Sequence, residues 1–216
     1  LDLVDRVRKV TGKPTGFKTV IGAYGWIETL LEEVIRRGLD SAPDFITIDS
    51  ADGGTGAAPM SLMDYMGMPI SESLPLVVDM LEKFQLRERI RVIVSGKLIN
   101  PAEAAWALCM GADFITSARG PMFALGCIQA LQCNKNTCPT GITTHNPKLQ
   151  RGLNPAIKAV RVKNYIQHMV HEIGVISHSC GVREPRELMR FHCRAVTETG
   201  KSKSMQELYP GHPAQD

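Results

Sequence analysis

Four short apolar runs, each followed by a turn and then by a helical pattern, constrain the fold of this chain more than any other feature. The predicted strands are Phe17–Ile21, Phe45–Ile48, Arg91–Val94 and Asp113–Thr116. The helices predicted to follow them are Trp26–Arg37, Leu74–Leu86, Pro101–Met110 and a helix that carries Leu125, Ile128 and Leu131. Successive βα units imply parallel strands that are joined by right-handed crossovers.

The residues that follow each predicted strand are glycine, serine, aspartate, lysine and arginine, which are typical of a functional site. In (β/α)8 barrels the active site is built at this carboxyl end of the strands, and a whole barrel needs about 250 residues. We therefore expect an α/β fold in which residues 1–152 form the C-terminal four βα units of a (β/α)8 TIM barrel. A small open sheet is the alternative that periodicity alone leaves open.

The rest of the chain, residues 153–216, reads as a helical extension and a polar tail. Its predicted helices are Ile157–Ile173 and Pro185–Val196, and a loose tail is predicted for Thr197–Asp216. The chain begins with Leu1 rather than methionine, so we expect the other half of the barrel to lie upstream.

Charge and hydropathy exclude some classes of partner. The net charge is only +3, with 25 basic and 22 acidic residues interspersed, which argues against nucleic acid as a partner. No apolar run approaches the roughly 20 residues that cross a bilayer. We expect no membrane partner and a cytoplasmic location.

Three cysteines, Cys127, Cys133 and Cys138, fall within twelve positions, and Pro139 follows the last of them. Thiolates are the ligands that iron–sulfur clusters use, and three of them favour a three-iron cluster. Two alternatives stay open at this point: a zinc site completed by His145, and three cysteines without a metal. Cys109, Cys180 and Cys193 are interpreted as buried thiols.

Three loops could bind an anionic cofactor. The first, after the second strand, contains Ser50, Gly53 and Gly54, and its glycines allow backbone amides to approach a ligand. An ordinary turn is the alternative. The other two loops follow the last two strands, where barrels often bind phosphate. Their candidate cofactor-binding residues are Ser95, Gly96, Lys97, Thr116, Ser117, Ala118 and Arg119. For Lys97 and Arg119 a solvated surface position is the alternative.

Lys18 is a candidate catalytic residue because it lies in the middle of an otherwise apolar strand. A charge in such a place is costly unless it has a partner. The alternative is a side chain that points outward and reaches solvent.

Three runs, DFITIDSADGGTGAAP, VIVSGKLINPAEAAWALCMGADFITSARGPMFALGC and CNKNTCPTG, closely resemble the FMN-binding domain of glutamate synthase. The resemblance covers about residues 1–155, and the tail resembles the stand-alone members of that family. It implies FMN as cofactor and a 3Fe–4S cluster held by Cys127, Cys133 and Cys138. It also implies that Lys18 lies against the flavin ring and the oxo-acid. Lys97 replaces a family glycine, and Ala51 replaces a family histidine.

The function that the resemblance implies is reductive amination of 2-oxoglutarate to glutamate, with ammonia supplied directly or from glutamine. Electrons would come from ferredoxin or an NAD(P)H-reductase subunit and pass through the cluster to FMN. The alternatives are an N-methylglutamate synthase flavin subunit, another FMN-dependent oxidoreductase, and an electron-transfer subunit without catalysis. Because a half-barrel leaves its sheet edges open, a homo-oligomer of two such halves is a further expectation.

Overall fold

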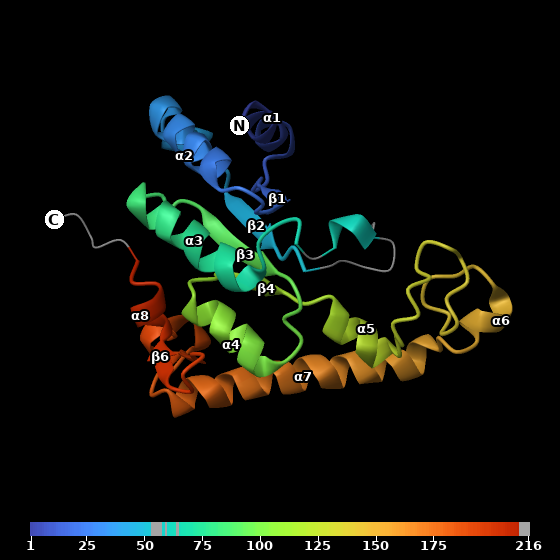
Figure 1. Cartoon of the computed structure of the whole chain (residues 1–216). Coiled ribbons are helices and arrows are strands. Elements are labelled where there is room, and N and C mark those ends of the chain that lie inside the picture. Colours follow the sequence, from blue (N-terminus) through green and yellow to red (C-terminus); the bar gives the residue numbers. More distant parts are fainter. Residues whose placement is uncertain (53–57, 59, 64, 212–216) are drawn as a thin grey trace.

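The computed structural model describes residues 1–52, 58, 60–63 and 65–211, and its centre is a parallel sheet (Figure 1). The strands are β1 (Phe17–Val20), β2 (Phe45–Asp49), β3 (Arg91–Ser95) and β4 (Phe114–Thr116). They pair side by side in chain order, and every pair is parallel. The four predicted βα units are thus confirmed as parallel strands joined by crossovers.

One face of the sheet is packed against helices and forms the core. Ile46, Ile48, Val92 and Val94 alternate along β2 and β3 and are almost fully buried. The covering helices are α2 (Gly25–Arg37), α3 (Ile70–Lys83) and α4 (Pro101–Cys109), and they lie along one side of the sheet in Figure 1. Short 3-10 turns η1 (Leu39–Ser41) and η2 (Met60–Leu62) occur in the connections.

The local sequence explains which face of α2 is buried and where α4 begins. In α2 the buried residues Ile27, Leu31 and Val34 are four and three positions apart, so they share one helix face. At the start of α4 the Asn100 side chain accepts from the Glu103 amide, and the Glu103 carboxylate accepts from the Asn100 amide. This reciprocal cap satisfies backbone donors that the first helical turn leaves free.

The opposite face of the sheet is open in the described structure. Lys18, Thr47, Ile93 and Phe114 lie in register across this face, and Phe114 is 48% exposed. β1 and β4 each pair with one strand only, so the described residues form an open sheet rather than a closed ring. Parallel sheets are normally covered on both faces. The α/β class is confirmed, and the closed barrel stays a proposal.

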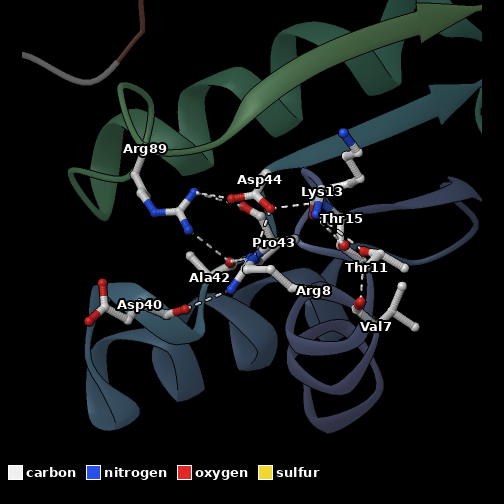
Figure 2. Close-up of polar contacts among 10 residues, drawn as sticks. All are labelled: Val7, Arg8, Thr11, Lys13, Thr15, Asp40, Ala42, Pro43, Asp44 and Arg89. Carbon is white, nitrogen blue, oxygen red and sulfur yellow. Dashed lines mark hydrogen bonds and ion pairs between the residues drawn. The ribbon is translucent and has the colours of Figure 1, made fainter.

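A helix that the sequence analysis did not predict, α1 (Asp2–Thr11), precedes β1 and ends at Gly12 in the left-handed conformation. Figure 2 shows how it is joined to the amino-terminal end of the sheet. The Asp44 carboxylate, which precedes β2, accepts from Arg8 Nε at 2.9 Å and from the Thr15 amide at 2.7 Å. Arg89 lies 3.1 Å from its other oxygen. One carboxylate therefore links α1, β2 and the start of β3.

Asp44→Asn is expected to lower the free energy of unfolding by roughly 1.5–3 kcal/mol, the usual range for hydrogen bonds to charged groups. Burial raises the pKa of the Asp44 carboxyl, but the Thr15 amide, Arg8 and Arg89 outweigh it and hold the pKa below its ordinary 3.8. The stabilisation is therefore present above pH 3.8 and is lost as the pH falls through the lowered folded-state pKa.

Urea unfolding at a series of pH values measures this contribution. The matched control is Asp40→Asn, because Asp40 contacts Arg8 only through its backbone carbonyl. Equal stability of the two variants at neutral pH would contradict the role of Asp44.

The last predicted helix of the barrel portion is shorter than expected. α5 (Arg119–Leu125) ends at Gly126, which is left-handed with φ 103° and donates to the Phe123 carbonyl. Ile128 and Leu131 were expected on this helix but lie beyond it, in a loop that extends to α6 (Pro147–Gln150). Glycine ends the helix here because it adopts a positive φ without a steric cost.

Much of the C-terminal region also differs from expectation. α7 (Pro155–Ser179) is the predicted long helix and packs beneath α4 and α5 (Figure 1). The helix expected at Pro185–Val196 is instead η3 (Pro185–Glu187), η4 (Arg190–His192) and β5 (Arg194–Val196). The tail expected to be loose contains β6 (Ser202–Ser204) and α8 (Met205–Leu208). β5 and β6 pair as an antiparallel hairpin, and periodicity over three residues is too short to reveal it.

The three cysteines outside the pocket loop contact the core. Cys109 is buried, and Cys180 and Cys193 are partly buried against the same hydrophobic cluster. In the part of the chain that the structure describes, no helix combines the length and apolar character that crossing a membrane requires.

Candidate functional site

A pocket of about 270 Å³ opens at the carboxyl end of the strands. It is bounded by β1, by the ends of β2 and β3, by the start of α5 and by the loop after α5. Its lining includes Lys18, Asp49, Ser95, Gly96, Lys97, Ala118, Arg119, Met122, Phe123, Cys127, Leu131, Cys133, Cys138 and Thr140. Residues up to 122 positions apart in the chain thus meet at the place where parallel sheets bind ligands.

An ion pair lies in the wall of this pocket. Lys18 Nζ is 2.7 Å from Asp49 Oδ2, and the lysine side chain remains 55% exposed. Lys18 is on the open face of β1, and Asp49 is the last residue of the neighbouring strand. The alternation that leaves the Lys18 side chain outside the core therefore directs it into the pocket.

The loop after β3 approaches the loop after β2 closely. Gly96 has φ 134°, and a β-carbon there would lie only 2.3 Å from Ser50 Cβ. Lys97 has φ 51°, so the lysine keeps a left-handed conformation that suits glycine. Its ammonium group lies 3.1 Å from the Asp52 carboxylate. Lys97 thus combines a positive φ with a charged side chain at the edge of the pocket.

Gly96→Ala is expected to destabilise the protein strongly. The clash with Ser50 and the left-handed backbone each cost roughly 1–3 kcal/mol. Gly22→Ala is the matched control, since a β-carbon at Gly22 meets no atom within 4 Å among the described residues. Thermal unfolding measures both variants, and equal midpoints would contradict the close approach.

Ser50 supports the loops rather than lining the pocket. Its hydroxyl accepts from the Ile70 amide at 3.0 Å and contacts Asp52, and its amide donates to the Ser95 carbonyl. Gly53 and Gly54, the other candidates in this loop, lie outside the described residues.

The loop after β4 is tied to the loop after β3 by Ser117, and a tyrosine of α7 binds the loop after β3 as well. Tyr165 donates to the Ile99 carbonyl at 2.6 Å, and Ser117 donates to the Leu98 carbonyl at 2.7 Å. Ala118 and Arg119 line the pocket, whereas Thr116 and Ser117 are not among its described lining residues. Tyr165 was not a candidate, because nothing in the sequence indicates that α7 reaches this loop.

The cysteine loop has an unusual backbone. Gln129, Leu131 and Asn136 all have positive φ, which non-glycine residues adopt only where surrounding contacts hold them. Two hydrogen bonds hold Asn136 in place. The Thr144 hydroxyl donates to the Asn136 carbonyl at 2.7 Å, and the His145 amide donates to Asn136 Oδ1 at 2.6 Å. The loop therefore has a defined shape around the pocket.

Cys127, Cys133 and Cys138 all line the pocket, yet no three histidine, cysteine or acidic side chains among the described residues converge on one metal ion. In an iron–sulfur cluster each cysteine binds a different iron, so its sulfurs surround a larger body than one metal ion. Three thiolates at one pocket are a donor set that such a cluster can use, and the cluster stays a prediction.

Cys138 is favoured as the thiolate that metal binding requires. Burial raises the pKa of the Cys138 thiol, but hydrogen bonds from the Thr140 side chain and the Thr143 and Thr140 amides lower it to about 6. These hydrogen bonds thus favour the thiolate form of Cys138.

Several lining residues were not predicted as site residues. Asp49 ends a strand, and that position alone could have identified it. Met122, Phe123 and Thr140 enter the lining only because α5 and the cysteine loop fold back over the sheet edge, which no local pattern indicates.

Residues 2–183 match the family model described as the conserved region in glutamate synthase. The glutamate synthase large subunit-like protein YerD of Bacillus subtilis (strain 168) is 38% identical over 96% of this chain and 39% of its own length. The archaeal-type glutamate synthase [NADPH] of Thermotoga neapolitana is 34% identical over 79% of this chain and 32% of its own length.

Among solved structures, a mutant flavocytochrome b2 with pyruvate bound matches 87% of this chain and 36% of its own length. The TM-score is 0.51 and the sequence identity is 18%, so this likeness concerns the fold alone. The chain spans about two fifths or less of the length of the curated relatives named above. Because the family model matches residues 2–183, which are most of the chain, the chain belongs to the glutamate synthase family.

Proposed function

We propose that this chain is the cofactor-binding part of a glutamate synthase-type oxidoreductase, which converts 2-oxoglutarate and ammonia to glutamate. One observation carries the proposal. Lys18, the loop of Ser95, Gly96 and Lys97, and the three cysteines come from separate segments and line one pocket. A flavin beside an iron–sulfur cluster needs a charged side chain, a backbone that can come close to the cofactor, and thiolate ligands for the iron.

The residues present suit FMN. The loops after β3 and β4 would hold its phosphate, because Gly96 brings backbone close to the pocket and Lys97 and Arg119 bring positive charge. When bound, FMN supplies hydride chemistry. Lys18 lies on the open face of β1, where its ammonium would orient an anionic oxo-acid and balance negative charge in the pocket. Cys127, Cys133 and Cys138 would hold the 3Fe–4S cluster that feeds electrons from ferredoxin or an NAD(P)H-reductase subunit.

The open face of the sheet supports a closed (β/α)8 barrel in the whole protein. Val20 and Phe114 are 41% and 48% exposed on the two edge strands, and both edges lack a second strand among the described residues. Exposed apolar edges of this kind need cover. Further βα units of a longer chain would cover them, as would a second copy in a homo-oligomer.

A second candidate is an FMN-dependent oxidoreductase that acts on another substrate. The observation that favours it is the pairing of Lys18 with Asp49 and of Lys97 with Asp52. Each carboxylate reduces the positive charge that a dicarboxylate such as 2-oxoglutarate would meet. A cationic amine substrate would instead be attracted by the same two carboxylates.

Anaerobic purification of the protein at its natural length tests the proposal. Absorbance, iron and sulfide content, EPR and analysis of released flavin are expected to show FMN and a three-iron cluster. Addition of 2-oxoglutarate and ammonia is expected to reoxidise the chemically reduced flavin and to yield glutamate. A protein without flavin and iron would overturn the proposal, and reoxidation only by other substrates would favour the second candidate.

A further inference from the structure

The sulfur of Cys138 has a hydroxyl group beside it. Thr140 Oγ1 lies 3.3 Å from Cys138 Sγ, within hydrogen-bond distance for sulfur. In the free protein either group can donate the proton. A cysteine that binds iron does so as a thiolate and has no proton, so the Thr140 hydroxyl must then be the donor.

The other hydroxyls of this segment do not contact the sulfur. Thr143 Oγ1 is buried and has no hydrogen-bond partner among the described residues. The Thr144 hydroxyl donates to the Asn136 carbonyl and accepts from the Asn146 amide. Thr140 is therefore the threonine of this segment whose hydroxyl lies beside Cys138 Sγ.

The backbone holds Thr140 in place. Gly141 has φ 82°, and a β-carbon there would lie 2.4 Å from the Leu149 carbonyl oxygen of α6. The segment after Cys138 is thus packed directly against α6, which fixes the position of the backbone next to Thr140.

We propose that Thr140 is a positioning residue whose hydroxyl donates to the Cys138 sulfur and raises the reduction potential of the proposed iron–sulfur cluster. This inference rests on the proposed function. Reduction brings one electron from the reductant to the cluster and breaks no bond in the protein. Donors at a ligand sulfur stabilise the added negative charge, so they favour the reduced form. The cluster then accepts electrons from a weaker reductant than it otherwise could.

The test is an EPR-monitored titration with dithionite of the anaerobically purified protein at its natural length. Thr140→Val, which keeps the shape and removes the donor, is expected to lower the midpoint potential of the cluster. Thr140→Ser, which keeps the hydroxyl, is expected to retain the native value. Thr137→Val is the matched control, because its hydroxyl donates to Gln132 Oε1 in the same loop.

Two results would overturn the inference in distinguishable ways. If the native protein and all variants carry the three-iron signal but Thr140→Val and Thr137→Val share one midpoint, the hydroxyl does not tune the cluster and the proposed function survives. If the native protein has no such signal, the proposed cluster is refuted and this inference with it.

Discussion

Cys133→Ala is expected to abolish the three-iron EPR signal and to stop electron flow from an external donor to the flavin. Cys133 lines the pocket between Cys127 and Cys138 in a loop whose backbone is held in strained conformations. Loss of one of three thiolates leaves an iron without its protein ligand, and the remaining two cannot hold the cluster in the same geometry. Activity driven through the cluster should fall to background.

The experiment separates the cluster from the flavin. Iron, sulfide and released FMN are measured on the same anaerobic sample, and flavin content is expected to stay near the native level. Cys180→Ala is the matched control, because Cys180 packs against the hydrophobic core at the end of α7. Retention of the EPR signal in Cys133→Ala would refute the assignment of Cys133 as a ligand.

The second large effect is expected for Lys18→Met, which removes the ammonium group while keeping an unbranched side chain. We expect a loss of roughly 10²-fold in kcat, the scale seen when one electrostatic donor is removed from an active site. The loss should appear in kcat and kcat/KM together if the charge acts mainly in the transition state. A rise in KM alone would assign Lys18 to substrate binding.

Steady-state kinetics with excess dithionite as the electron donor measures this effect without the natural electron donor. Lys13→Met is the matched control, since Lys13 is exposed in the turn before β1, outside the described pocket lining. Because Lys18 pairs with Asp49, the variant also leaves a carboxylate without its partner. Unchanged kinetics in Lys18→Met would remove Lys18 from the catalytic proposal.

The sequence by itself determined the features that depend on local pattern. Four apolar runs, each followed by a turn and a helical pattern, predicted four parallel strands, and the structure contains them in chain order. The spacing of Cys127, Cys133 and Cys138 and the runs around them identified the family, which the family model supports. These signals survive without tertiary information because each lies within one βα unit or one loop.

Only the tertiary structure decided how the segments meet. The ion pair of Lys18 with Asp49 depends on the register between β1 and β2, and Tyr165 reaches the loop after β3 only because α7 packs beneath α5. The hairpin of β5 and β6 replaced an expected helix and tail, since each three-residue strand is stable only when paired with the other. These features depend on contacts between segments that are far apart in the chain. A local sequence pattern cannot predict them, because it does not indicate which distant residue a side chain will contact.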